Sequence, residues 1–387
     1  MTATLPPAAW VAALAGLPGM GPARLAAVLR RWPPEEAWAR VAAGQAHLDR
    51  DVATRARIPE LQASRWRTAA AQADVAAAWE AHRAAGVAVR TPADEGFPLV
   101  LAEDPEPPAV LFSRGDVGVL DHPRVAVVGT RRCTWAGRSL AAELGAGLAT
   151  AGVCVVSGLA LGIDGAAHRG ALAARGVAPV AVVGTGLDVV YPRRNAELWE
   201  AVAAAGALLS EYPLGTRPEP WRFPARNRLV AALADIVVVV ESHARGGSMH
   251  TVTAALERDV TVMAVPGPVR APAAAGPNAL LVAGAAPVRD AEDVLVALGL
   301  DSVANGRGIR DAEPVPADPG QARVLAALQQ APATIEQLAQ RLEREVGIIA
   351  VQLAQLELAG LVTACGGWWE VTGAAPGPRG PGRGSVP

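Results

Sequence analysis

Short loops that combine glycine, small hydroxyl side chains and arginine recur in the middle of the chain. One is the Gly-Thr-Arg-Arg run at residues 129–132, and a second begins at Ser157 and Gly158. Glycine lets a ligand approach the backbone closely, and a guanidinium group can donate two parallel hydrogen bonds to a phosphate. These residue types therefore favour a site for a phosphate-bearing ligand.

Arg131 and Arg132 precede a helical pattern, and this position leads to a specific prediction. The N-terminus of a helix carries partial positive charge, so cations placed there oppose the helix dipole. A bound phosphate would offset that opposition, and we expect one at the start of this helix. The alternative is that both arginine side chains are simply solvated.

Arginine and aromatic side chains are mixed in the stretch RFPARNR at residues 222–228. Proteins that bind single-stranded nucleic acid use positive charge to follow the backbone and aromatic rings to stack the bases. Because Pro220 and Pro224 flank Phe223, we expect a loop rather than a helical face. The alternative is a core phenylalanine beside a solvated run of charges.

Other residues near these loops have narrower expected roles. The Gly246-Gly247-Ser248 turn can present backbone amides to a phosphate. Asp164 is expected to cap the helix that carries His168, because a carboxylate in the site would repel phosphate. His168 is expected to be a structural histidine rather than an acid or a base.

The elements that position these loops are short apolar runs separated by helical patterns. Such runs, bounded by glycine, indicate buried parallel strands. We expect strands at residues 125–128, 153–156, 180–183, 207–209, 236–240, 260–265 and 279–282. We expect helices at residues 137–150, 164–174, 195–205, 226–234, 248–258 and 290–298. This alternation predicts an α/β fold with a doubly wound parallel sheet, in which ligands bind at the carboxyl ends of the strands.

Helical patterns dominate the region before this sheet. Residues 1–85 predict a helical domain, and residues 14–25 resemble a helix-hairpin-helix. The reading we favour there is an ordinary helical hairpin with Pro22 in the first turn of its second helix. The domain at residues 86–300 begins with a strand near residues 87–90. Proline-rich, extended chain follows it, which we expect at an edge of the sheet or in a loop.

The C-terminal part follows a different pattern. Residues 301–319 are expected to form a linker, residues 320–372 a winged-helix domain, and residues 373–387 a disordered tail. Within the winged helix, a capping box begins a helix at Thr334, and residues 346–358 form the next helix. A β-hairpin is expected at residues 361–371. The helix at 346–358 contains no basic residue, which favours a protein-interaction module over a duplex reader.

Composition sets limits on the class of protein. The chain has 387 residues and a net charge of −2, and all 35 of its basic residues are arginine, which a GC-rich genome would explain. Its three cysteines are far apart, which argues against disulfides and structural zinc. The sequence shows no signal-peptide or membrane-spanning pattern. We therefore expect a cytoplasmic protein that is not bound to a membrane.

Seven ordered motifs between about residues 95 and 300 resemble the DNA-processing protein A (DprA/Smf) family. They read VAVVGTRR, VVSGLALGIDGAAHRGAL, VAVVGTGLDVVYPRRN, LLSEYPLGT, FPARNR, VVVVESHARGGSMHT and MAVPG. The resemblance implies an extended Rossmann-like sheet with an N-terminal helical domain, similar to a sterile-alpha-motif domain, and a C-terminal winged helix. It also implies a homodimer without enzymatic activity or a cofactor. Such a protein binds and protects single-stranded DNA and loads the RecA recombinase during natural transformation.

The candidate DNA-binding residues come from the loops and from this resemblance together. They are Gly129, Thr130, Arg131, Arg132, Ser157, Gly158, Arg222, Phe223, Arg226, Asn227, Arg228, Gly246, Gly247 and Ser248.

Two rival functions are open to a sheet of this kind. One is a nucleotide-binding enzyme of the phosphoribohydrolase type, but residues 245–251 lack the PGGxGTxxE pattern of those enzymes, and no GxGxxG follows residue 128. The other is a transcription regulator that reads DNA with its winged helix, against which the missing basic residues count.

Overall fold

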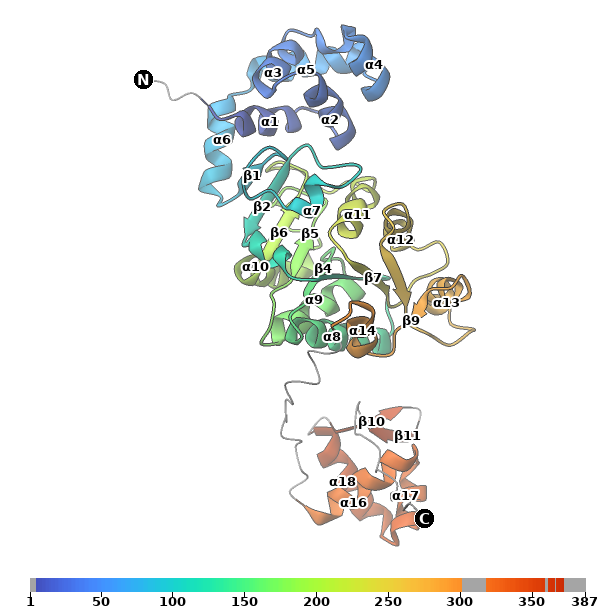
Figure 1. The fold of residues 1–387 in the computed structure, drawn as a ribbon. Coiled ribbons are helices and arrows are strands. Elements are labelled where there is room, and N and C mark those ends of the chain that lie inside the picture. The colour runs from blue at the N-terminus through green and yellow to red at the C-terminus, as the bar shows by residue number, and fades with distance from the viewer. Residues whose placement is uncertain (1–4, 301–317, 359–360, 366, 372–387) are drawn as a thin grey trace, which may run out of the picture. The chain divides into compact units, whose positions relative to one another are not determined.

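The computed structural model describes residues 5–300, 318–358, 361–365 and 367–371 (Figure 1). The chain divides into two compact units, Met1–Gly306 and Arg307–Pro387. Most of the predicted linker and the whole predicted disordered tail lie outside the described residues.

A nine-stranded sheet organises the first unit, in the order β1-β2-β6-β5-β4-β3-β7-β8-β9. The strands are β1 (Ala88–Arg90), β2 (Leu111–Gly115), β3 (Arg124–Val128), β4 (Cys154–Ser157), β5 (Val180–Val182), β6 (Ala207–Ser210), β7 (Ile236–Val239), β8 (Thr261–Ala264) and β9 (Ala286–Pro287). Pairing is parallel from β6 to β9 and antiparallel at β1, β2 and β6. The predicted doubly wound α/β fold is confirmed.

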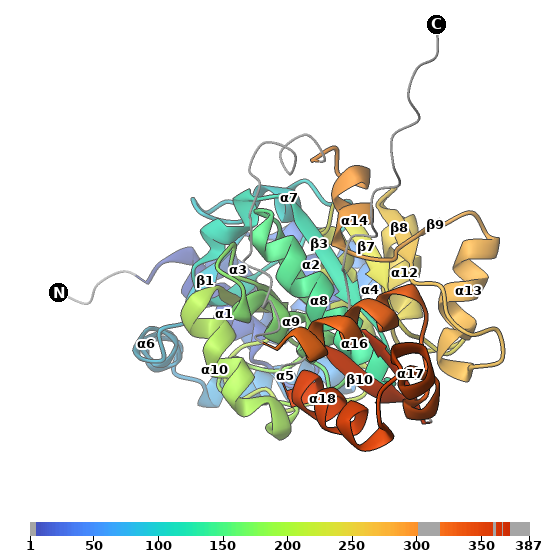
Figure 2. The ribbon, with the colours of Figure 1, turned by 90° about the horizontal axis from the view of Figure 1, so that it is seen from below.

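Helices cover both faces of the sheet (Figure 2). They are α7 (Leu99–Ala102), α8 (Trp135–Thr150), α9 (Ile163–Ala173), α10 (Ala196–Ala205), α11 (Arg222–Ala232), α12 (Met249–Leu256), α13 (Ala275–Val282) and α14 (Ala291–Ala297). Alternate residues of one strand face opposite layers. Val125 and Val127 pack with α8, α9 and α14, whereas Ala126 and Val128 pack with α11 and α12. This double burial explains why the strands are almost wholly apolar.

Six helices precede the sheet: α1 (Pro7–Ala15), α2 (Pro22–Arg31), α3 (Pro34–Ala42), α4 (Arg50–Ala56), α5 (Glu60–Gln72) and α6 (Val75–Ala84). Most of the buried side chains of α1 to α5 join one cluster with Phe112 of β2 and Trp199 of α10. Pro22 occupies the first turn of α2, as predicted for the hairpin. The side-chain nitrogens of Gln62 and Trp66 both donate to Pro18 O, at 2.6 and 3.0 Å, so this turn packs against α5.

Several predicted elements were wrong. Residues 279–282 belong to helix α13 and do not form a strand. Residues 222–228 form the start of α11 and are not a loop. Pro224 lies within the first turn of that helix, where backbone N–H groups lack intrahelical partners, so proline removes no hydrogen bond there. The chain after β1 also contains a short helix, α7, and then forms β2 inside the sheet.

The second unit has its own small core. It contains α16 (Pro319–Gln330), α17 (Ile335–Leu342), α18 (Val346–Leu358), β10 (Val362–Cys365) and β11 (Trp368–Val371). The capping box at Thr334 and the predicted hairpin are both present. Leu338, Ile349 and Leu353 are buried in its core. Among the described residues of the whole chain, no helix is both long enough and apolar enough to cross a membrane.

Candidate nucleic-acid interface

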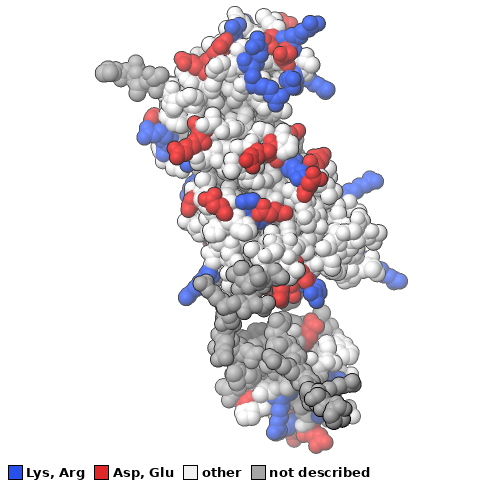
Figure 3. Space-filling model, viewed as in Figure 1, with Lys and Arg blue, Asp and Glu red and all other residues white. Residues whose placement is uncertain are grey.

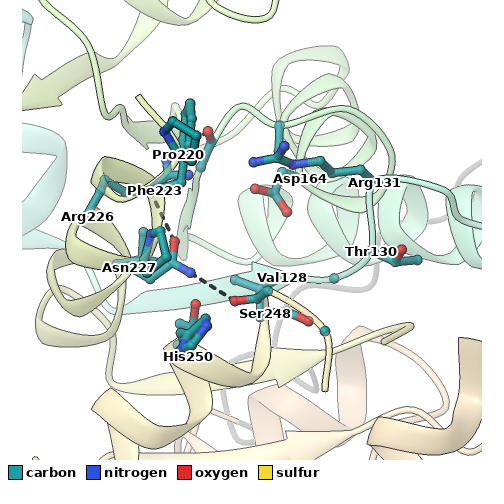
Figure 4. A pocket seen from close by; sticks show the side chains of 18 of the residues that line it. Val128, Thr130, Arg131, Asp164, Pro220, Phe223, Arg226, Asn227, Ser248 and His250 are labelled. Carbon is teal, nitrogen blue, oxygen red and sulfur yellow. Dashed lines mark hydrogen bonds between the residues drawn. The ribbon is translucent and has the colours of Figure 1, made fainter. Parts of the chain in front are cut away.

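A cavity of about 780 Å³ opens at the carboxyl ends of the central strands. The sheet order reverses at β3, because the chain runs from β3 outward to β6 and then returns to β7 on the other side. Loops that follow such a reversal leave a crevice between them, which is the usual ligand site of open α/β sheets. The loops after β3, β4, β5 and β7, together with α11, form the walls (Figure 4).

Most of the predicted site residues meet in this cavity. Those that line it are Gly129, Thr130, Arg131, Arg132, Gly158, Phe223, Arg226, Asn227, Gly246, Gly247 and Ser248. Sequence reasoning missed Tyr191, His243 and His250, which also line it. Tyr191 lies in the loop after β5, so its place after a parallel strand was the available signal.

Ser157, Arg222 and Arg228 do not line the cavity. Ser157 is fully buried, and its hydroxyl donates to Val127 O at 2.6 Å. Arg222 lies over the rings of Tyr212 and Trp221. Arg228 points elsewhere and forms an ion pair with Glu211.

An exposed stack of three side chains forms one wall of the cavity. The guanidinium carbon of Arg131 lies 5.1 Å from the centre of the Phe223 ring. The Phe223 ring in turn lies 5.2 Å from the ring of Tyr191, with 33° between the planes. Figure 4 shows the Arg131 side chain extending from the loop after β3 toward Phe223 of α11. This arrangement places a cation beside two aromatic faces that a planar base could contact.

Arg226 has a different role from Arg131. Its side chain is only 5% exposed, and its guanidinium donates to Gly158 O at 2.8 Å and to Val182 O. Burial lowers the pKa of Arg226 to about 10, which still leaves it charged at neutral pH. A Cβ at Gly158 would lie 2.5 Å from this guanidinium, so a larger residue there would displace Arg226. Arg226 therefore ties the loop after β4 and the end of β5 to α11.

The expected capping role of Asp164 was wrong. Helix α9 is preceded by Gly162, at φ 81°, and has no side-chain cap. Asp164 is instead 7% exposed in the cavity wall. Burial raises the pKa of its carboxyl group, while the charge of Arg226 and nearby backbone N–H groups act in the opposite direction. Asp164 thus balances the buried charge of Arg226.

The start of α8 also differs from the prediction. The carboxylate of Glu241, from the end of β7, accepts hydrogen bonds from Thr134 N at 2.8 Å and from the Thr134 hydroxyl at 2.6 Å. Thr134 in turn caps Gly137 N at 3.0 Å. A side-chain carboxylate therefore already occupies the place that we had expected a phosphate to take. Arg131 and Arg132 lie before the first turn of α8, and neither residue caps this helix.

The turn after β7 leaves two backbone amides available. Gly246 N donates to His243 O at 2.9 Å, which removes it from the predicted nest. Asn227 of α11 donates to Gly247 O at 3.1 Å and fixes the turn. Within the described residues, the N–H groups of Gly247 and Ser248 have no intramolecular acceptor. They precede α12, so an anion there would meet two donors and the helix dipole.

His168 lies behind this site in α9. It is fully buried, and neither ring nitrogen has a hydrogen-bond partner among the described residues. Burial, together with the charge of Arg226, lowers its pKa to about 3, so the ring is neutral. No group of three or more His, Cys, Asp or Glu side chains that could hold a metal ion occurs in the described part of the chain.

Comparison with known proteins agrees with the motifs. The family model described as DNA recombination-mediator protein A matches residues 88–299, and the model of the DprA winged helix domain matches residues 310–367. The chain belongs to the DNA-processing protein A family. The predicted resemblance is thereby confirmed, as is the winged helix at the C-terminus.

Individual relatives support the same assignment. The chain is 38% identical over 284 residues to Protein Smf of Escherichia coli, covering 71% of this chain and 75% of that protein. It is 41% identical over 202 residues to the DNA processing protein DprA of Streptococcus pneumoniae, covering 52% of this chain and 71% of that one. The second of these relatives is named for DNA processing, and the family to which the chain belongs is involved in DNA processing.

Two solved structures of DprA resemble the fold. The X-ray structure from Streptococcus pneumoniae matches with a TM-score of 0.62 and 31% identity, over 76% of this chain and 98% of that one. The structure from Helicobacter pylori matches with a TM-score of 0.51 and 31% identity, over 56% and 96%. The latter structure is described by its single-stranded DNA binding mode.

Proposed function

We propose that this protein binds single-stranded DNA in the cavity at the carboxyl ends of the sheet. The bound strand is protected and passed to the RecA recombinase during natural transformation, with the protein acting as a cytoplasmic homodimer without enzymatic activity. Membership in the DNA-processing protein A family supports the proposed protection of the strand and its transfer to RecA.

The observation that carries the proposal is the stack of Arg131, Phe223 and Tyr191 beside the free amides of Gly247 and Ser248. Arginine and backbone amides bind phosphates, whereas the two rings offer flat apolar faces to unpaired bases. A duplex hides those base faces in its own stack, so the arrangement favours a single strand.

A competition gel shift tests this proposal. Labelled oligo-dT is bound first, and then excess unlabelled single strand, duplex of equal length or free nucleoside monophosphate is added. We expect the single strand to displace the label at the lowest concentration. Displacement by the duplex at equal concentration would contradict the proposal. Turnover of the nucleotide would also contradict it and would favour the phosphoribohydrolase alternative.

A variant of Phe223 locates the binding. Stacking on an aromatic residue contributes about 1–3 kcal/mol per base, so Phe223→Leu is expected to weaken binding by that amount. Phe223→Tyr keeps the ring and is the matched control, with near-native affinity. Equal affinity of the two variants would show that no base stacks at this position.

A further inference from the structure

A second large hollow lies outside the cavity described above. It is a groove of about 890 Å³ between helix α2 and the segments around residues 91–93 and 105–109. Its floor consists of small apolar residues and prolines, such as Ala26, Ala27, Pro105 and Pro107. Four arginines line it: Arg30, Arg31, Arg55 and Arg228.

The charge of this region differs from that of the whole chain. Residues 1–85 contain ten arginines and seven acidic residues, although the protein carries a net charge of −2. Figure 3 shows arginine side chains gathered over the N-terminal helices near α4. An excess of positive charge on one part of a mildly acidic protein is typical of a surface that meets a polyanion.

Two of the groove arginines have no intramolecular partner. Arg31 pairs with Asp49 at 2.9 Å, and Arg228 pairs with Glu211. By contrast, Arg30 and Arg55 are exposed and, among the described residues, lie within 4.0 Å of no carboxylate oxygen. The remaining acid in the groove is Glu106, whose side chain is 74% exposed and lies 3.9 Å from Arg258.

The groove and the first cavity approach each other near Trp221. Pro220, which precedes Trp221, lines the cavity. The ring of Trp221 is 49% exposed, and it lies 3.7 Å from where a Cβ of Gly21 would be. Gly21 is followed by Pro22, which lines the groove. The half-exposed indole of Trp221 therefore lies between a residue that lines the cavity and one that lines the groove.

We propose that the groove holds the continuation of the single strand bound in the cavity. The strand passes Trp221, which stacks one base, and its phosphates then reach Arg30 and Arg55. This inference rests on the proposed function and extends its binding site onto the N-terminal helices. The position of the groove next to the cavity, with the aromatic Trp221 between them, favours nucleic acid over an acidic peptide, which the same charges would also attract.

Oligonucleotide length separates the two sites in an experiment. The affinities of oligo-dT of about 8 and about 30 nucleotides are measured over a series of salt concentrations for the full chain and for the variant Arg30→Ala/Arg55→Ala. Each lost phosphate contact reduces the slope of log affinity against log salt by about 0.7 for a single strand. We expect the slope for the long strand to fall by about 1.4 in the double variant and its affinity to fall several-fold. For the short strand, neither the slope nor the affinity is expected to change.

The matched control is Arg83→Ala/Arg175→Ala, which removes two exposed arginines on other elements and is expected to bind both lengths like the native chain. Unchanged thermal unfolding of both double variants shows that the fold is intact. An unchanged slope for the long strand in the groove variant would overturn the inference, as would an equal loss for both lengths. Binding of a glutamate-rich peptide that depends on Arg30 and Arg55, without an effect on the long strand, would also overturn it. Failure of the native chain to bind the short strand would instead contradict the proposed function.

Discussion

Arg131 and Arg226 both line the cavity, but their side chains have different roles. Arg131 is exposed and lies against Phe223, so its guanidinium can bind a ligand. Arg226 is buried and donates to the backbone carbonyls of Gly158, after β4, and of Val182, at the end of β5. Removal of Arg226 would leave those carbonyls without this donor and Asp164 without the opposite charge that offsets its burial, which is costly in a buried site. Its contribution to binding is therefore indirect, through the shape of the cavity wall.

Sequence reasoning identified the residue types at this site but not these separate roles. The motif FPARNR shows three arginines in seven positions with Arg222, and nothing in their spacing says which is buried. In α11, Arg226 and Arg228 point in different directions because successive helical residues turn by about 100°. We predicted a loop at these residues, and a loop does not fix the directions of the Arg226 and Arg228 side chains as a helix does.

The buried state of His168 leads to a prediction about pH. Its pKa of about 3 in the folded protein is lower than the value of 6.5 for an unperturbed histidine. Between these two values the unfolded chain binds more protons, so stability is lost as the pH falls below about 6.5. We expect the free energy of unfolding to fall by about 2 kcal/mol between about pH 7 and pH 5 from this residue alone.

Urea unfolding at the two pH values measures this effect. His168→Leu has a similar volume and no titratable group, so the difference between the two pH values should be smaller in this variant by the same amount. An identical pH dependence in the native chain and the variant would show that His168 is protonated in the folded protein.

At the scale of elements, most short apolar runs were correctly predicted as strands, but one of them belongs to a helix. Short apolar runs separated by helical patterns identified six strands of the sheet because both faces of each are buried. The run ALLV at residues 279–282 looked similar, but it forms the last turn of α13. A short apolar run has no periodicity that separates a strand from a buried helix segment.

The winged-helix unit gives a prediction at the same scale. Helix α18 contains no arginine, and Val346, Ile348 and Val351 are exposed on it. Since phosphates are bound mainly by basic side chains, this helix has little with which to bind DNA. We therefore expect a chain that ends at residue 306 to retain most of the affinity for oligo-dT.

We expect this shortened chain to fold, because the hydrophobic core clusters of the first unit contain no residue of the second unit. A loss of more than about tenfold in affinity, with the thermal unfolding of the first unit unchanged, would correspond to over 1.4 kcal/mol of binding free energy from the second unit. Such a result would contradict the interpretation of the winged helix as a module that contacts proteins.

At the scale of the whole molecule, the net charge is close to zero, but arginines line both the cavity and the groove in which we propose that DNA binds. The net charge of −2 gave no indication of nucleic acid. The arrangement of parallel strands brings the loops after β3, β4 and β7 together, although they are far apart in the sequence. The fold rule for ligand sites in open sheets predicted that meeting from the sequence. The groove beside α2 was not predicted, because it depends on how helices and proline-rich segments pack.

The most direct test of the central claim is the salt dependence of binding to a short oligo-dT, measured for the native chain and for Arg131→Ala, with Arg175→Ala as the control. We expect the log of the affinity to fall linearly with the log of the salt concentration, with a slope smaller by about 0.7 in Arg131→Ala and unchanged in the control. An affinity that does not respond to salt, or a slope that Arg131→Ala leaves unchanged, would contradict the claim that this cavity binds the DNA backbone.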